Sequence, residues 1–239
     1  MERFVSRDDA RLWTYASGAG IPIILLNGGP GCDDYLGPVA ALIEDVGRVV
    51  RFEPRGCGRS SWDKHYDLQT AVEDIEHVRH AYAFDRFIAI GHSAGVDTAL
   101  AYALAYPGRV QHLIGLAGGR IVNDREWSRV YKENLAARGE DTGGLVFNAD
   151  PDVNTIGVAT WREYITRPTL LGDLANLFTT ATFMFPSHDI RPSWPTQQLA
   201  NLLPRGQYVE IAGATHYLWL SHAQQLQAAL RAAIERGED

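Results

Sequence analysis

The sequence predicts an α/β fold, with a mostly parallel twisted sheet, helices on both faces and a small inserted helical cap. Three observations predict it. Short, continuously apolar runs such as 21–26 are typical of strands buried on both faces of a parallel sheet. Runs with helical spacing, such as 67–82, alternate with these strands. The alternation lapses between about residues 118 and 172, where a long segment follows a strand, as an inserted lid does.

Length and charge restrict the class of protein. A chain of 239 residues with 46% hydrophobic content can bury one sizeable core. We therefore expect one domain, with a core formed by residues 1–117 and 173–239 and a cap formed by 118–172. The net charge of −7 and the absence of a Lys/Arg-rich run argue against nucleic acid and anionic membranes as partners. A small neutral or cationic molecule is the expected substrate.

The cellular setting is predicted from the first residues and the cysteines. The sequence begins without an apolar segment of signal-peptide length, and its longest apolar stretches are strand-sized, so we expect a cytoplasmic protein. Cys32 and Cys57 are the two cysteines, and neither has the spacing of a metal ligand. Two free thiols, no metal and no cofactor are expected. A monomer and a homodimer both remain open.

The first half of the chain contains strands and helices in alternation. Residues 4–6 and 11–15 flank Asp8 and Asp9 as an N-terminal hairpin would. After the strand 21–26, Asp33 or Asp34 could cap a helix that runs to Val46 and ends at Gly47. A strand at 48–52 and a helix at 67–82 follow.

The second half is predicted in the same way. Pro107 ends an apolar helix that starts at Ala94. The remaining elements are strands at 86–90, 111–117, 181–185 and 207–211, helical pieces at 126–138 and 154–165 within the cap, and a closing helix at about 221–236.

The stretch Gly91-His92-Ser93-Ala94-Gly95 indicates a nucleophile. This Gly-x-Ser-x-Gly pentad lies between a predicted strand and a predicted helix, which is the context that a nucleophile elbow requires. The turn is so sharp that larger residues at Gly91 and Gly95 would collide. Ser93 is thereby held above the sheet, at the positive end of the helix that follows. We predict that Ser93 is a catalytic nucleophile.

A serine needs a base and an orienting acid. The chain order serine, aspartate, histidine, each in a loop after a strand, selects Ser93, Asp189 and His216. Most other histidines lie before or inside the elbow, on helices, or at the start of a strand. His188, adjacent to the proposed acid, is a rival for the base, but it precedes the last strand, where the base is not expected. Asp124, shortly after the preceding strand, is a rival for the acid.

The loop Asn27-Gly28-Gly29-Pro30-Gly31 follows a buried strand and lets the backbone approach a ligand closely. Pro30 has no N–H, so Gly28 and Gly29 are the expected oxyanion donors, with Gly29 preferred and the Ala94 N–H as partner. A phosphate-binding loop is the competing interpretation, but no Gly-Lys-Ser/Thr follows.

Other residues are weaker candidates. Asp97 either complements the dipole at its helix start or supports Ser93 from below. Arg55 could contact substrate, although an ion pair with Glu53 or another carboxylate of its loop is expected. His77 and His80 are expected on an exposed helix face rather than at a metal. The predicted substrate-binding residues are aromatic: Trp127, Tyr131, Trp161 and Tyr217.

The elbow, the triad and two loops together resemble a known family. The sequence resembles the α/β-hydrolase superfamily over nearly its whole length and, through Asn27–Gly31 and Arg55–Ser60, its proline iminopeptidase branch. The resemblance implies the α/β-hydrolase fold. Members of the branch have histidine at the place of Asn27, Asp-Gln at Glu53-Pro54 and tryptophan at Ala94, and a larger cap whose carboxylates bind the substrate's amino terminus.

These observations predict a serine hydrolase that works through an acyl-enzyme. Hydrolysis of a small carboxylic ester is the leading hypothesis, and release of N-terminal residues, as a proline iminopeptidase does, is the alternative. A non-catalytic ligand receptor on the same fold also remains open, because a fold alone does not fix a function.

Overall fold

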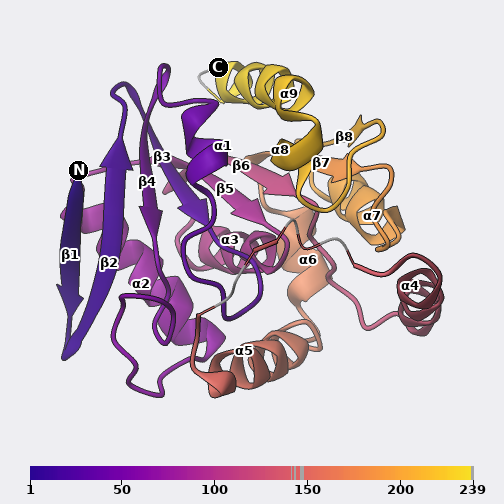
Figure 1. Ribbon diagram of the computed structural model, residues 1–239, viewed down its shortest axis with the longest axis horizontal. Helices are drawn as coiled ribbons and strands as arrows, with labels where there is room; N and C mark the ends of the chain where they lie inside the picture. Colours follow the sequence, from indigo (N-terminus) through magenta and orange to yellow (C-terminus); the bar gives the residue numbers. More distant parts are fainter. Residues whose placement is uncertain (141, 143, 146–147, 238–239) are drawn as a thin grey trace.

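The computed structural model describes residues 1–140, 142, 144–145 and 148–237. Its centre is an eight-stranded sheet with the order β1-β2-β4-β3-β5-β6-β7-β8 (Figure 1). β1 and β2 form an antiparallel hairpin, β2 pairs antiparallel with β4, and all later neighbours pair parallel. The predicted mostly parallel sheet is confirmed.

The predicted strands are present, with boundaries that differ by a few residues at most. The long apolar strand at 21–26 has the bounds that its sequence predicts. The strands are β1 (Glu2–Arg7), β2 (Ala10–Ser17), β3 (Ile21–Leu26), β4 (Gly47–Phe52), β5 (Phe87–His92), β6 (Val110–Leu116), β7 (Thr180–Pro186) and β8 (Gly206–Ile211).

One predicted helix is shorter than expected. α1 covers only Gly37–Ala41, its N-cap is Leu36 rather than an aspartate, and Gly47 opens β4 instead of ending a helix. Asp34 is used differently, because its carboxylate pairs with Arg51 of β4. The other helices are α2 (Leu68–Ala81), α3 (Ala94–Ala105), α4 (Arg125–Arg138), α5 (Pro151–Tyr164), α6 (Leu170–Ala175), α7 (Trp194–Leu202), α8 (Leu218–Ser221) and α9 (Ala223–Arg236).

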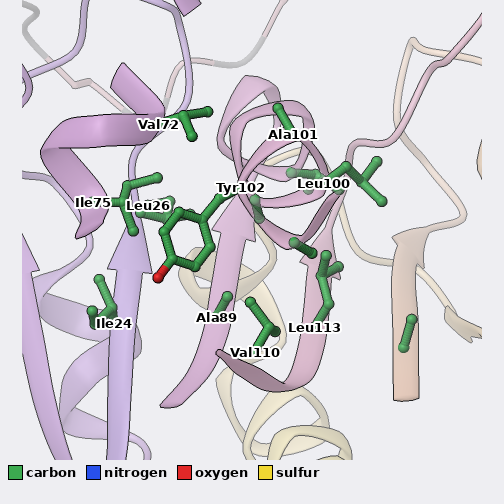
Figure 2. Packing of buried hydrophobic residues seen from close by; sticks show 14 of the residues in the cluster. Ile24, Leu26, Val72, Ile75, Ala89, Leu100, Ala101, Tyr102, Val110 and Leu113 are labelled. Carbon is green, nitrogen blue, oxygen red and sulfur yellow. The ribbon is translucent and has the colours of Figure 1, made fainter. Parts of the chain in front are cut away.

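Two hydrophobic cores cover the two faces of the sheet. Alternate side chains of β5 enter different cores, with Phe87 and Ala89 on the side of α2 and α3, and Ile88 and Ile90 on the side of α1 and α9. This alternation is the period of two that any strand imposes. Figure 2 shows the fully buried Tyr102 of α3 among the residues of the first core.

The described residues between β6 and β7 form three helices. α4 has no buried residue, and in Figure 1 α4 and α5 lie toward the border of the molecule, away from α9. α6 differs, because its Leu170 and Leu174 belong to the first hydrophobic core. The predicted end of the cap at residue 172 therefore falls inside a helix that packs on the core. The division into core and cap stays a prediction.

The parallel strands bring the predicted functional loops to one edge. β3, β5, β6, β7 and β8 all end on the same side of the sheet. The chain passes from β3 to β4 on one side and then crosses to β5 on the other, so the sheet has its topological switch point beside β3. Ligands of open α/β sheets bind at such points.

Candidate active site

Ser93 occupies a sharp turn between β5 and α3. Its backbone has φ 54° and ψ −121°, a conformation that costs a non-glycine residue of order 1–3 kcal/mol. A Cβ at Gly91 would overlap the Gly95 carbonyl oxygen, and a Cβ at Gly95 would overlap that of Leu26 in β3. The structure thus gives a steric reason for both glycines. The Ser93 N–H donates to the Leu116 carbonyl at 2.8 Å, which fixes the turn against β6.

His216 and Asp189 meet although they come from different loops. His216 Nδ1 lies 2.6 Å from Asp189 Oδ2. The Asp189 side chain is fully buried, and the backbone N–H of His188 donates to the Ala214 carbonyl, which joins the loops after β7 and β8. The rival Asp124 is elsewhere, because its carboxylate caps α4 by accepting from Glu126 N–H. Of the two aspartates, Asp189 is the one that contacts His216.

The electrostatics of Asp189 keep it ionised. Burial by itself raises the pKa of Asp189, but the hydrogen bond with His216 and the charges of His216 and Arg191 outweigh it, and the pKa lies below its ordinary value. Asp189 Oδ1 accepts from the Arg191 backbone N–H at 2.9 Å and from its Nη1 at 3.2 Å. A carboxylate only accepts, so His216 Nδ1 is the donor of this hydrogen bond, and in the neutral imidazole Nε2 is the nitrogen that can take a proton.

His92, the residue before Ser93, connects the elbow to the histidine loop. The His92 ring lies 4.7 Å from the His216 ring, and its Nε2 lies 3.0 Å from the His216 carbonyl oxygen. No hydrogen bond joins the Ser93 hydroxyl to His216 among the residues that the structure describes. Catalytic hydrogen bonds of this kind often form fully only in the complex with substrate.

Burial, together with the charge of His216, lowers the pKa of His92 well below its ordinary value, so its ring is neutral. Because its Nε2 faces a carbonyl and must donate, its Nδ1 accepts from the Tyr35 hydroxyl at 2.6 Å. The Tyr35 oxygen in turn accepts from the Gly28 N–H at 2.7 Å. This chain of hydrogen bonds links Gly28, Tyr35, His92 and His216, and it has no signal in the sequence.

The predicted oxyanion donors differ in whether their N–H groups already have an acceptor. The Gly28 N–H is already bonded to Tyr35, so it is not a free donor. Within the described part of the chain, the N–H groups of Gly29 and Ala94 donate to no other residue. Ala94 is the first residue of α3, where helical N–H groups have no partner within the helix. A Cβ on Gly28 would lie 2.9 Å from Ser93 Cβ, which shows how closely this loop approaches the elbow.

A cavity of about 260 Å³ opens beside Ser93. Among the predicted substrate-binding residues, Trp127 and Trp161 lie on its wall. Tyr131 and Tyr217 do not. Tyr131 stacks on Trp127 at 5.2 Å, and Tyr217 is 6% exposed and packs edge-on against the His216 ring at 5.2 Å. Both therefore support lining or reacting residues rather than face the cavity.

Arg55, a further candidate, has structural partners. It reaches the cavity wall, but its guanidinium binds Asp74 at 2.9 Å and Asp63 at 2.5 Å, whereas Glu53 pairs with Arg59. The expected ion pair with a carboxylate of the same loop is thus made with Asp63 and not with Glu53, and Arg55 makes more hydrogen bonds to Asp74 of α2.

Neither the two cysteines nor His77 and His80 of α2 form a disulfide or a metal site. Cys32 and Cys57 are buried and unpaired, and burial, with the charge of Asp33, raises the pKa of Cys32 to about 12. His77 and His80 are exposed. Among the described residues no group of His, Cys, Asp and Glu could hold a metal ion.

None of the described helices has the length and hydrophobicity to cross a bilayer.

Comparison with known proteins agrees with this architecture. A model of the family described as alpha/beta hydrolase fold matches residues 21–179, which is more than half of the 239-residue chain. The chain belongs to the alpha/beta hydrolase fold family. The members of this family that it resembles in sequence include the proline iminopeptidase of Neisseria gonorrhoeae, which is 30% identical over 182 residues, covering 61% of this chain and 54% of that protein. The chain thus spans about half the length of the curated relatives it matches.

Solved structures of other alpha/beta hydrolases superpose on almost the whole chain. A thermophilic esterase from Thermogutta terrifontis has a TM-score of 0.80 at 18% identity and covers 100% of both chains. A proline iminopeptidase from Mycobacterium smegmatis has a TM-score of 0.75 at 16% identity, covering 99% of this chain and 98% of its own. At such identities the likeness shows the fold alone. Neighbours of the chain thus include both esterases and iminopeptidases.

Proposed function

We propose that this alpha/beta hydrolase is a serine hydrolase that cleaves small carboxylic esters through an acyl-enzyme. The observation that carries the proposal is the 2.6 Å contact between His216 Nδ1 and buried Asp189, next to the strained turn of Ser93. A base held in one tautomer by an ionised acid is what a serine nucleophile needs. The cavity of about 260 Å³ suits a small substrate.

The reaction follows from these positions. His216 Nε2 takes the proton of Ser93 Oγ as this oxygen attacks the ester carbonyl carbon. The N–H groups of Gly29 and Ala94 bind the oxyanion that develops, and each such donor contributes about 100- to 1,000-fold in rate. The tetrahedral intermediate collapses, and His216 gives its proton to the departing alcohol. Water, activated by the same histidine, then releases the acid and restores Ser93.

Release of N-terminal residues is the second candidate, and the similarity to proline iminopeptidases favours it. Such a substrate brings an ammonium group, which needs a carboxylate when it leaves water. Glu126 and Glu133, with side chains 61% and 60% exposed, instead pair with Arg129 outside the cavity. Glu163 is exposed and also lies outside it. These positions support the ester hypothesis.

The proposal is tested by acylation. Mixing the protein with 4-nitrophenyl acetate should give a burst of nitrophenolate equal to the enzyme concentration, with an acetyl adduct on the peptide that contains Ser93. Ser93→Ala should reduce kcat on the order of a million-fold without loss of the fold. Retention of turnover in this variant would refute the proposed nucleophile, and absence of any burst in the wild type would favour a non-catalytic receptor.

Ser221 provides a matched control. Its hydroxyl lies 2.7 Å from His222 Nδ1, so it also has a histidine partner, but it is exposed and lies away from the cavity. Ser221→Ala should keep wild-type turnover and labelling by a fluorophosphonate. Loss of labelling in Ser221→Ala but not in Ser93→Ala would show that Ser221 is the reactive serine and would refute the proposal.

A further inference from the structure

Most charged groups on the cavity wall are already paired within the protein. Arg55 binds Asp74, and Arg191 binds Asp189. Three charged residues of the wall have no ion pair, and no hydrogen bond to another side chain, among the residues that the structure describes. They are Asp97, Arg120 and Arg162. Arg162 is exposed, whereas Asp97 and Arg120 are only partly exposed. A charge removed from water without a partner costs several kcal/mol, so a ligand that pairs with the partly enclosed groups is favoured.

Arg120 is the most enclosed cation among them. It follows Gly118 and Gly119 after β6, and its guanidinium lies over the Trp127 ring at 4.2 Å from the centroid. This stacking orients the guanidinium but leaves its N–H donors uncommitted. Burial lowers the pKa of Arg120, which the nearby charge of Asp97 partly offsets. An arginine nevertheless stays protonated in proteins, so the cavity keeps a positive charge here.

Asp97, the carboxyl group that acts on this charge, forms no ion pair with Arg120. It lies one turn beyond Ser93 on α3, and its buried Oδ1 has no hydrogen-bond partner. Burial raises the pKa of Asp97 well above its ordinary value, although the charge of Arg120 and the Gly119 N–H act in the opposite direction. A raised pKa favours the protonated form of a carboxyl group, which can donate a hydrogen bond.

We infer that this site, formed by Arg120 and Asp97 and here called the Arg120–Asp97 site, binds a carboxylate at the far end of the substrate's acyl chain. The inference rests on the proposed ester hydrolysis. A guanidinium binds a carboxylate through two parallel N–H···O bonds, and a protonated carboxyl can donate to the same group. The substrates are thus half-esters of small dicarboxylic acids rather than the neutral or cationic molecules that the net charge of −7 predicts.

The position of the site selects the acyl chain rather than the alcohol. His216 protonates the departing alcohol, so the alcohol must lie beside His216. The cavity wall includes Ser93, Asp97 and Arg120 but not His216. We therefore assign a group that reaches Arg120 from a carbonyl bound at Ser93 to the acyl chain rather than to the alcohol.

Three 4-nitrophenyl esters of the same length test the inference. They are the monoester of adipic acid, its methyl ester, and the ester of 6-(trimethylammonio)hexanoic acid, which are anionic, neutral and cationic. With the uncatalysed rate subtracted, kcat/KM should be about tenfold higher for the anion than for the neutral ester, as a hydrogen-bonded ion pair warrants. The cation should be the poorest of the three.

Variants of the arginine connect this preference to the site. Arg120→Met should bring the ratio of anionic to neutral kcat/KM to about one, and Arg120→Lys should restore part of the preference by returning the charge. Arg129→Met is the control, because Arg129 carries the same charge on α4 but pairs with Glu126 and Glu133 outside the cavity. It should leave the ratio and the turnover of the neutral ester at wild-type values.

The outcomes separate this inference from the proposed function. Rapid turnover of the neutral ester without preference for the anion would leave ester hydrolysis standing and overturn the carboxylate site. Preference for the cation would overturn it too, and would make Asp97 an ammonium site. If no ester is cleaved, calorimetric titration decides, since adipate should bind at least tenfold more tightly than dimethyl adipate and lose this advantage in Arg120→Met. Equal binding of the two would overturn the inference.

Discussion

Replacement of Asp189 by asparagine tests the proposed triad at its most specific point. Oδ1 of Asp189 accepts two hydrogen bonds from Arg191, and Oδ2 accepts one from His216. An amide offers a single acceptor oxygen. Turning that oxygen toward Arg191 satisfies two donors, whereas turning it toward His216 satisfies one and sets the NH₂ group against Arg191. The contacts therefore predict that the introduced asparagine side chain turns its NH₂ group toward the histidine.

The magnitude follows from the tautomer. Facing an NH₂ group, His216 Nδ1 must accept, so its proton moves to Nε2. Nε2–H cannot take the proton of Ser93. In a serine triad the wrong tautomer lowers kcat by about ten-thousand-fold, equivalent to about 5.4 kcal/mol of transition-state stabilisation. We expect Asp189→Asn to lose this amount, while binding and the oxyanion donors maintain a residual rate.

The assay is the pre-steady-state burst with 4-nitrophenyl acetate, together with thermal unfolding of each variant to verify the fold. Asp124→Asn is the control, since Asp124 caps α4 and asparagine caps helices equally well. We expect it to keep activity within about threefold of the wild type. An Asp189→Asn enzyme within about tenfold of the wild type, or a larger loss in Asp124→Asn, would refute the assignment of the acid.

Three further expectations concern stability. Gly95→Ala should lower the free energy of unfolding by about 3 kcal/mol because its Cβ overlaps a β3 carbonyl. Gly172→Ala in α6 introduces a Cβ that contacts no other atom and should raise the free energy of unfolding by about 0.5–1 kcal/mol. Equal effects of the two substitutions in urea unfolding would refute the steric argument. Tyr35→Phe should cost about 1–3 kcal/mol, since it leaves a buried backbone N–H without its acceptor, and an unchanged midpoint would contradict this. Burial raises the pKa of Asp97, so above about pH 4 the folded state keeps a proton that the unfolded chain has lost. Relative to Asp97→Asn, the wild type should therefore lose up to about 1.4 kcal/mol per pH unit as pH rises toward the folded pKa, and a pH-independent difference would exclude this linkage.

The fold could be predicted largely from local patterns. Buried strands such as β3 read as continuous apolar runs, and α3 reads as an apolar helix ended by proline. The helix expected to run to Val46 ends at Ala41, and its expected aspartate cap is absent because the Asp34 carboxylate pairs with Arg51. α7 was missed. It begins at Trp194-Pro195 and is short, so it has few turns over which a helical pattern could repeat.

The candidate site was predictable where chemistry requires a fixed order or spacing. The elbow motif and the chain order led to Ser93, Asp189 and His216, and the structure brings the last two together. The roles of Tyr35 and Arg120 depend on contacts between distant segments, for which a single sequence contains no signal. One weak signal existed for His92, whose place inside the elbow restricts it to the end of a buried strand.

The hydrogen-bond network around Ser93 and the Arg120–Asp97 site have different expected roles in the cavity. At the reacting end, Gly28, Tyr35, His92 and His216 satisfy one another, so the oxyanion loop and the histidine loop cannot shift independently of the elbow between them. Such preorganisation stabilises a transition state without reorganisation during the reaction, and it works for any ester that reaches Ser93. Discrimination between esters must then come from groups that are not yet paired, which the described part of the wall has in the first turn of α3, at Asp97, and after β6, at Arg120. In the proposed mechanism chemistry and selectivity belong to different residues, so we expect substitution of Arg120 to change the preferred ester without changing the mechanism.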